Sequence, residues 1–335
     1  MLPALQAMDL HRVARKIESW FARHQRPLPW RETYDPYRVW VSEVMLQQTR
    51  MEVVVPYFEK FVKRFPTLRA LAAASEEDVM AAWSGLGYYR RARMLHAAAR
   101  AANGVVPRTV EKLTTLPGVG RYTAGAIASI AYNQRAPIVD GNVARVLARI
   151  FGSEDDAWGR AQQLVDACKT PRDLNQGLME IGALICTPRK PACLVCPLRT
   201  DCATRSDALP VAKPKKETRA LRIALYLITD RKGRVLMRRE SGPLMNAMYH
   251  LPHGDTSLLS GKPLTVVTLD LLGTFKHTVT TRRIEFALYT ATARVRASRE
   301  WAWVDTGGMS SVAHPSYVAK ALRIWASRPP SLPAS

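Results

Sequence analysis

The sequence has no long hydrophobic run, and a transmembrane helix needs about 20 mainly apolar residues. Its N-terminal stretch also lacks the apolar core and small-residue cleavage site of a secretory signal. We therefore expect a soluble cytoplasmic protein that does not bind a membrane.

Acidic residues are scarce relative to basic ones. The chain has 335 residues, with 28 Asp and Glu against 49 Lys and Arg, which gives a net charge of +21. Both halves of the chain are basic, whereas charge kept for solubility alone is usually smaller and less one-sided. The imbalance predicts a polyanionic partner. Nucleic acid fits it better than a membrane surface, because no basic amphipathic anchor or lipidation signal is present.

A nucleotide-binding phosphate loop is also missing, although one glycine-rich turn occurs, LPGVG at 116–120. No strand pattern precedes this turn and no Gly-Lys-Ser/Thr follows it, so it does not predict a nucleotide site. Gly118 and Gly120 can expose backbone N–H groups at the start of a helix, where a phosphate could bind. A plain turn between two helices explains the same residues equally well.

The hydrophobic periodicity changes once along the chain. Apolar residues recur at helical spacing over 9–23, 52–64, 76–101, 123–133, 143–151 and 160–184. The pattern stops between about 203 and 219, where proline and lysine mark a solvated linker. Strand-like patterns follow at 221–229, 235–239, 265–272 and 283–294, with a final helix near 315–326. The sequence therefore predicts a helical domain followed by a small α/β module.

Four of the five cysteines fall in one short window, at Cys186, Cys193, Cys196 and Cys202. Disulfides are disfavoured in a cytosolic chain, so this grouping indicates a metal. A structural zinc site usually has two close pairs separated by a long gap, which this window lacks. Four thiolates on one compact loop favour a [4Fe–4S] cluster over zinc or unligated thiols. The fifth, Cys168, has the pattern of a core residue.

Two acidic residues stand in apolar surroundings. Glu43 stands among the apolar residues of 41–46, where burial would raise its pKa and keep it protonated, as a general acid requires. An exposed first-turn glutamate, favoured by the helix dipole, is the alternative. Asp140 follows two β-branched residues at the predicted start of a helix. It is therefore either an N-cap or a carboxylate held beside a bound phosphate backbone.

A glycine-framed aromatic tip, GLGYY at 85–89, precedes the arginines of 90–93. Such a tip can wedge into a stack of bases while the arginines bind phosphates. An aromatic plug on the protein's own core is the alternative use of these residues.

Taken together, the motifs resemble the adenine DNA glycosylase (MutY) family of the endonuclease III-like helix-hairpin-helix superfamily. The resemblance covers nearly all of the first 205 residues, with LPWR at 28–31, VSEVMLQQTR at 41–50, GLGYYRRAR at 85–93, LPGVGRYT at 116–123, VDGNVARVLAR at 139–149 and MEIGALICTPRKPACLVCPLRTDC at 179–202. In the lyases of this superfamily a lysine stands two positions after the LPGVG turn, where this chain has Tyr122. The resemblance thus implies a glycosylase that works without a Schiff base.

The resemblance also implies a role for each matching residue. Glu43 would protonate the adenine and Asp140 would stabilise the sugar cation, because N-glycosidic cleavage passes through an oxocarbenium-like state. Tyr122 and Asn142 would steady these groups and the attacking water. The residues implied around the adenine and in the base stack are Arg26, Trp30, Arg31, Gln48, Thr49, Leu86, Tyr88 and Glu180. Gly118 and Gly120 would bind the DNA backbone, and the four clustered cysteines would hold the cluster.

From residue 220 the chain resembles, more loosely, the family's Nudix-like domain, which contacts the 8-oxoguanine opposite the adenine. The match rests on GPLMNAMYHLP at 242–252 and on Phe275, Lys276 and His277, and the clustered glutamates of a Nudix hydrolase are missing. Where the family has a serine that can accept from the N7–H of 8-oxoguanine, Lys276 can only donate. A lysine pairs with the N7 and O6 acceptors of unmodified guanine, so we expect weaker selectivity for 8-oxoguanine.

The sequence thus predicts a multidomain fold. An all-α helix-hairpin-helix glycosylase domain at 1–205, with its cluster loop at 186–202, precedes a linker at 206–219. A smaller α/β Nudix-like domain at 220–327 and a disordered tail at 328–335 follow. The expected function is removal of adenine mispaired with 8-oxoguanine or guanine, by a monomer that flips the adenine out of double-stranded DNA.

Two other functions stay open on the sequence. A glycosylase that also nicks the strand is one, and Tyr122 argues against it. A non-catalytic mismatch sensor is the other, and the presence of both Glu43 and Asp140 argues against it.

Overall fold

A computed structural model of the chain describes residues 8–211, 219–239, 248–254, 264–279, 282–295, 300–307, 309 and 312–327. The chain divides into two compact units. The first comprises residues 1–73 and 94–213, and the second comprises 74–93 and 214–335. Much of the predicted linker and all of the predicted tail, together with 242–247 of the second motif match, lie outside the described residues.

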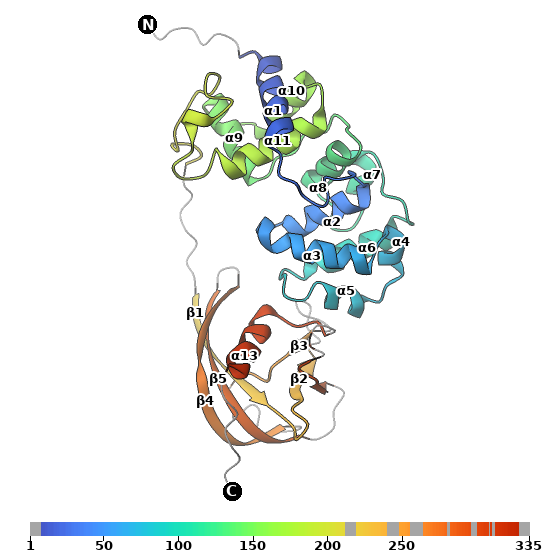
Figure 1. Cartoon of the computed structure of the whole chain (residues 1–335), viewed down its shortest axis with the longest axis vertical. Helices are drawn as coiled ribbons and strands as arrows, with labels where there is room; N and C mark the ends of the chain where they lie inside the picture. Colours follow the sequence, from blue (N-terminus) through green and yellow to red (C-terminus); the bar gives the residue numbers. More distant parts are fainter. Residues whose placement is uncertain are drawn as a thin grey trace. The chain divides into compact units, whose positions relative to one another are not determined.

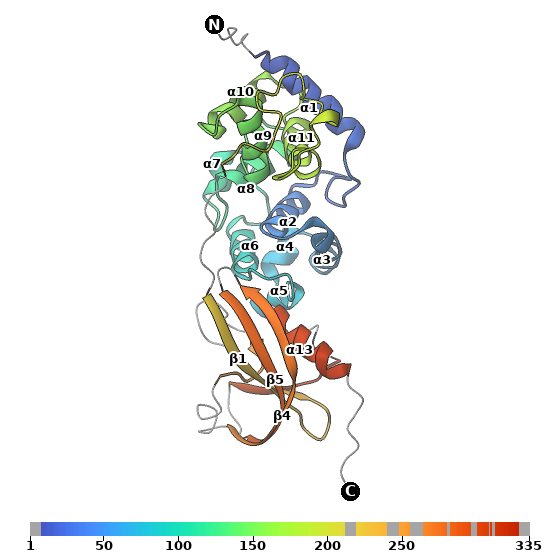
Figure 2. The ribbon, with the colours of Figure 1, turned by 90° about the vertical axis from the view of Figure 1, so that its left-hand side faces the viewer.

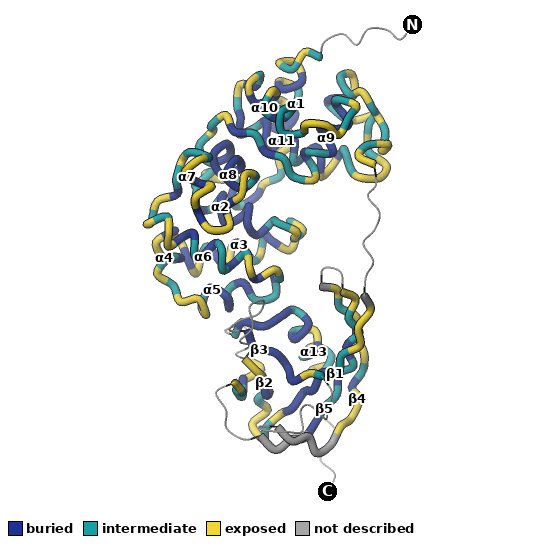
Figure 3. The backbone as a smooth tube through the Cα atoms, turned by 180° about the vertical axis from the view of Figure 1, so that it is seen from behind, coloured by how far each residue is buried: buried dark blue, intermediate teal, exposed yellow. Residues whose placement is uncertain are grey.

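Helices build the first unit (Figure 1). They are α1 (Leu10–His24), α2 (Pro36–Leu46), α3 (Met51–Arg64), α4 (Leu68–Ala73), α7 (Val110–Thr114), α8 (Arg121–Ala126), α9 (Gly141–Phe151), α10 (Ala157–Ala167) and α11 (Pro171–Leu184). A π-helical turn, Ile127–Ala131, continues α8. The core of this unit includes Ile17 and Phe21 of α1, Leu147 of α9 and Leu178 of α11, and Figure 3 shows buried residues in dark blue.

The observed helix ends differ from the predicted ones where glycine or proline intervenes. The single helix predicted over 160–184 is two helices, because Pro171 begins α11 after α10 has ended. The helix predicted over 76–101 is also two, α5 (Glu76–Ala82) and α6 (Arg90–Ala101). Gly85 and Gly87 separate them with φ of 92° and 77°, a backbone that glycine adopts without strain.

Aspartates fix where several of these helices begin. The carboxylates of Asp9, Asp35 and Asp140 each accept from the backbone N–H three residues later, at 3.0, 2.8 and 2.7 Å. Such caps satisfy one of the N–H groups that a helix start leaves without a partner. Asp140 is therefore held in place by the first turn of α9.

The second unit contains two three-stranded sheets. One has the order β1-β5-β4, with β1 (Arg219–Ile228) parallel and β4 (Leu264–Val279) antiparallel to β5 (Arg282–Val295). Figure 2 shows these strands side by side. The other sheet has the order β3-β2-β6, formed by β3 (Tyr249–His250), β2 (Val235–Arg239) and β6 (Trp301–Val304), all antiparallel.

One helix, α13 (Ser316–Ala326), completes the core of the second unit. Its Val318 and Ala321 are buried in one cluster with Phe286 and Leu288 of β5. The prediction of a module containing both strands and a final helix is thus confirmed. Of the two histidines near Pro252, His250 is buried and His253 is exposed. None of the helices in the described ranges combines the length and apolarity that a bilayer crossing requires.

Candidate active site

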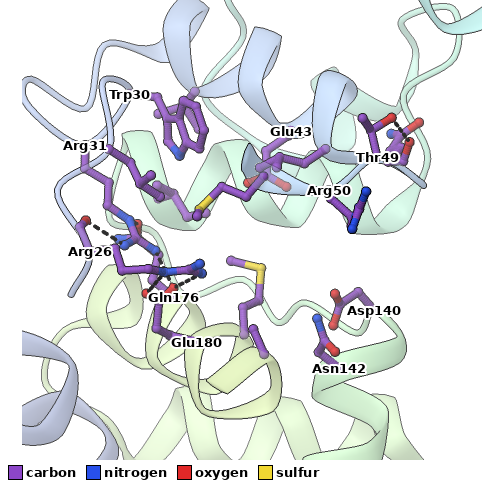
Figure 4. A pocket seen from close by; sticks show the side chains of 18 of the residues that line it. Arg26, Trp30, Arg31, Glu43, Thr49, Arg50, Asp140, Asn142, Gln176 and Glu180 are labelled. Carbon is purple, nitrogen blue, oxygen red and sulfur yellow. Dashed lines mark hydrogen bonds and ion pairs between the residues drawn. The ribbon is translucent and has the colours of Figure 1, made fainter. Parts of the chain in front are cut away.

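A pocket of about 820 Å³ opens in the first unit. It lies between α2, the start of α8, the turn before α9, and α11. Figure 4 shows Glu43 on one wall, with Asp140 and Asn142 facing it from the other side. The predicted residues that line this pocket are Arg26, Trp30, Arg31, Glu43, Gln48, Thr49, Tyr122, Asp140, Asn142 and Glu180.

Glu43 is a buried carboxyl, with only 5% of its surface exposed. It is the eighth residue of α2, so the alternative of an exposed first-turn glutamate is wrong. Burial raises the pKa of Glu43 to about 7, against a hydrogen bond from Tyr122 that lowers it, and the nearby charge of Asp140 adds to the rise. At neutral pH a large share of the molecules therefore carry a proton here, as a general acid requires.

Tyr122 in the first turn of α8 positions Glu43. Its hydroxyl donates to Glu43 Oε2 at 2.9 Å and also contacts Met179 Sδ at 3.4 Å. Burial raises the pKa of Tyr122 well above its usual value, and the charges of Glu43 and Asp140 raise it further. The phenol consequently remains a neutral donor over the whole working pH range.

Asp140 is the N-cap of α9, which is one of its two predicted roles, and it also lines the pocket. Burial raises its pKa, whereas the backbone N–H groups of Val143 and Asn142 lower it. Asn142 is fixed as well, because its Oδ1 accepts from Arg145 Nη2 at 2.8 Å. Arg145 in turn donates to the carbonyl of Gly182 at 2.7 Å, so the start of α9 is tied to α11.

The opposite end of the pocket holds an ion-paired carboxylate. Glu180 Oε1 accepts from Arg26 Nε at 2.5 Å, and its Oε2 accepts from Arg31 Nη2 at 3.1 Å. Burial alone would raise the pKa of Glu180, but the two guanidinium groups hold it below its usual value. One pocket thus contains a carboxyl with a lowered pKa at Glu180 and one with a pKa raised to about 7 at Glu43, and such a separation marks distinct chemical roles.

The lining residues that the sequence analysis missed include Gln176 and Met179. Gln176 Oε1 accepts from Arg31 Nε at 2.9 Å, and Gln176 lies one helical turn before Glu180 on α11. Helical spacing from Glu180 could therefore have identified it. Nothing in the local sequence distinguishes Met179 from a core methionine.

Other predicted residues lie outside the pocket lining. Leu86 is buried, whereas Tyr88 is 49% exposed. Tyr88 and Gln48 both have a left-handed backbone, with φ of 49° and 57°, which is uncommon for residues other than glycine. Strained backbone of this kind often marks a functional position, which is compatible with side chains that enter a base stack.

The Phe275–His277 segment is part of β4 and belongs to the second unit. Phe275 is buried in the core cluster, 5.3 Å from the ring of Phe286. Lys276 is exposed, as alternation along a strand requires. Of the three residues, Lys276 therefore has the most accessible side chain.

The glycine turn joins two helices, α7 and α8, with no strand before it. Gly118 has φ of 73°, and a Cβ there would lie 2.4 Å from Met94 Cβ. Gly120 is the N-cap of α8, and nothing lies within 4 Å of a Cβ built on it. Position 118 therefore needs glycine, because its backbone has a positive φ and a side chain there would clash with Met94.

The four predicted cysteine ligands line one cavity. Within the described ranges, no three His, Cys, Asp or Glu side chains lie close enough to share a single metal ion. A [4Fe–4S] cluster takes one cysteine on each of four irons, so its ligands stand further apart than those of one zinc ion. This donor set fits such a cluster. Cys168, by contrast, is buried in the helical core, as predicted.

Comparison with known proteins relates the chain to DNA repair enzymes. Residues 41–169 match the model of the HhH-GPD superfamily base excision DNA repair protein. The adenine DNA glycosylase of Homo sapiens is 48% identical over 209 residues, which are 56% of this chain and 38% of the human protein. That of Mycobacterium tuberculosis is 43% identical over 234 residues, which are 65% of this chain and 75% of that protein. The chain spans only about two fifths of the length of the mammalian relatives.

Solved structures show the same helical fold. A thermostable thymine-DNA glycosylase superposes with a TM-score of 0.54 at 31% identity, covering 58% of this chain and 96% of that one. Endonuclease III in a non-covalent DNA complex superposes with a TM-score of 0.50 at 24% identity, covering 58% of this chain and 93% of that one. At this identity the second likeness establishes the fold alone.

Proposed function

Because the chain belongs to the adenine DNA glycosylase family, we propose that it hydrolyses the N-glycosidic bond of adenine in double-stranded DNA. The observation that carries this proposal is the pair of carboxyl groups on opposite walls of one pocket, Glu43 with a pKa of about 7 and Asp140 at the start of α9. The pocket can receive a base only after that base has left the duplex, so adenine is flipped out before cleavage.

Glu43 acts on the base. It gives its proton to a ring nitrogen of adenine, so that the C1′–N9 bond breaks and the bonding electron pair leaves with a neutral base. The hydroxyl of Tyr122 donates a hydrogen bond that fixes the carboxyl and stabilises the negative charge that Glu43 carries after it has given up its proton. Tyr122 also stands where the related lyases have a lysine, so no Schiff base forms with the sugar.

Asp140 acts on the sugar. Its carboxylate stabilises the positive charge that develops on C1′, as acids do in glycoside hydrolysis. Asn142, oriented by Arg145, positions the water that adds to C1′. The proton released by that water passes to a pocket carboxylate, and the products are adenine and an abasic site.

The Glu180 end of the pocket recognises adenine. Trp30 is buried against Phe58, with ring centroids 5.1 Å apart, and forms an apolar wall. Arg31 donates to the amide oxygen of Gln176, so that both side chains are fixed polar groups in the lining of the pocket. Polar groups fixed in this way favour one base over others, because a wrong base would leave them without partners.

The direct test is single-turnover release of adenine from three matched duplexes, with 8-oxoguanine, guanine or thymine opposite the adenine. We expect release from the first two and little from the third. If no duplex released adenine, the chain would be a mismatch sensor at most. Borohydride trapping should give no covalent complex with DNA.

Release of adenine should decline as the pH rises above about 7, roughly tenfold per pH unit, because Glu43 must be protonated to act. In Tyr122→Phe the decline should begin at a higher pH. The hydrogen bond from Tyr122 lowers the pKa of Glu43, so its loss raises that pKa further. The pH dependence of the single-turnover rate measures both effects. A decline that stays in place or moves to lower pH in the variant would contradict this role of Tyr122.

We propose further that the second unit is the Nudix-like domain that reads the opposite base, and that Lys276 weakens its selectivity for 8-oxoguanine. Lys276→Ser should then raise the ratio of the rate of adenine release opposite 8-oxoguanine to the rate opposite guanine. We expect a rise of about fivefold or more, since one good base contact contributes about 1–3 kcal/mol of discrimination. The control is Lys232→Ser, which removes an exposed lysine from the turn before β2. An unchanged ratio in Lys276→Ser would eliminate this role of Lys276.

We also propose that the four clustered cysteines hold a [4Fe–4S] cluster. When bound, the cluster joins distant points of a loop that contains only one short helical turn, Cys193–Val195. Iron analysis of the purified chain tests this.

A further inference from the structure

Arg149, near the end of α9, is one of the largest fully buried side chains, with 2% of its surface exposed. Its guanidinium donates to the carbonyl oxygens of Thr187 at 2.8 Å, Pro188 at 3.2 Å and Leu209 at 2.6 Å. It also donates to Cys186 Sγ at 3.3 Å. This one side chain thereby connects the beginning of the cysteine loop to the chain that follows the loop.

The three carbonyl partners accept hydrogen bonds from Arg149 but do not balance its charge. Among the described residues, no carboxylate forms an ion pair with it. A guanidinium does not lose its proton in a protein, so it cannot escape the cost of burial by becoming neutral. A counter-charge is therefore needed close to Arg149, and the nearest group able to supply one is the cysteine site.

Two of the four cysteines contact Arg149 directly. Cys186 accepts from its guanidinium, and Cys202 Sγ lies 3.2 Å from its backbone carbonyl oxygen. Four thiolates outweigh the positive charge of a [4Fe–4S] core, so the site becomes anionic when the cluster is bound. The buried cation and the cavity lined by the cysteines then complement each other.

We propose that Arg149 is the buried counter-cation of the iron–sulfur cluster and raises its reduction potential; this inference rests on the proposed cofactor. The reduced state carries one more negative charge than the oxidised state. A nearby cation and an N–H···S hydrogen bond therefore stabilise the reduced state more. Arg149 thus makes oxidation of the cluster less favourable, and with it the loss of the cluster under oxidant.

Voltammetry of the full iron-loaded chain can separate charge from hydrogen bonding. Arg149→Gln keeps donors for the loop carbonyls but removes the charge, whereas Arg149→Lys keeps the charge but cannot reach all of the carbonyls. At a fixed potential, we expect Arg149→Gln to raise the ratio of oxidised to reduced cluster at least tenfold, which is about 59 mV for one electron. Its visible absorbance should also bleach faster under oxidant. The lysine variant should stay close to the parent protein in both measurements.

The matched control is Arg135→Gln. Arg135 likewise donates to backbone carbonyls, those of Val165 and Cys168, but it contacts none of the four clustered cysteines. The reduction potential of the cluster in Arg135→Gln should equal that in the parent protein. The proposal is overturned by equal potentials in Arg149→Gln and the parent, or by a shift in Arg149→Lys as large as that in Arg149→Gln.

Iron content distinguishes the remaining outcomes. Iron retained in Arg149→Lys but lost from Arg149→Gln supports the counter-cation. Iron lost from both variants indicates a tether that depends on hydrogen bonds, and overturns it. If the parent chain itself holds no iron, the proposed cofactor is wrong, and that result is obtained before any variant is made.

Discussion

Glu43→Gln is expected to lower the single-turnover rate of adenine release by roughly 10²–10⁴-fold, the usual contribution of a general acid. Glutamine has nearly the same shape and can still accept the hydrogen bond from Tyr122, but it has no proton of the required acidity to give. Binding to a mismatched duplex should be nearly unchanged, because Glu43 is buried inside the pocket, away from the protein surface that contacts the DNA backbone. Rapid-quench assays and titration of the same duplex measure the two quantities.

The same variant tests the burial of Glu43 through stability. The pKa of Glu43 is about 7 in the folded chain and 4.5 in the reference state, so folding retains a proton that the unfolded chain loses between these values. Stability therefore falls as the pH rises through this window. Arg26→Ala should have the opposite effect and lower stability, since it removes one of the two guanidinium partners of the ionised Glu180. Chemical denaturation should show Glu43→Gln to be more stable than the parent at pH 8, by at most about 3 kcal/mol, with the gain disappearing near pH 4.

A Glu43→Gln variant that released adenine at the parent rate would remove Glu43 from the chemistry altogether. If the variant instead lost both release and duplex binding, Glu43 would have a structural role. Retained binding without release also excludes the non-catalytic sensor, since a sensor has no release to lose.

The sequence motifs located many of the residues that line the pocket, such as Glu43, Asp140 and Glu180. They could not decide between alternatives that differ only in whether a residue is buried. For Glu43, an exposed first-turn position and a buried acid were both compatible with the run 41–49. The structure decides between them because α2 is covered on nearly all sides. For the same reason the helical period is weak in α2, and the periodicity did not reveal the helix.

Contacts between segments far apart in the sequence were beyond prediction from local patterns. In the sequence, Arg149 had no predicted role beyond being the last residue of the motif at 139–149. Its contacts with Cys186 and Leu209 depend on how the cysteine loop folds back on α9. Gln176 likewise gains its role from Arg31, 145 residues earlier in the chain. Local patterns do reveal caps, which is why the helix start at Asp140 was foreseen.

Asp140→Asn should separate the two roles of this residue. Asparagine caps helices about as well as aspartate, so α9 should still begin at residue 141 and the thermal midpoint should hardly change. The amide carries no negative charge for the developing sugar cation, and we expect adenine release to fall by roughly 10²–10³-fold. Asp140→Ala should lose activity to the same extent and about 1 kcal/mol of stability as well, because it removes the acceptor for Val143 N. Single-turnover rates and thermal unfolding of the two variants give the comparison. If Asp140→Asn kept its activity, capping alone would explain this residue, and the sugar cation would have to be stabilised by another group in the pocket.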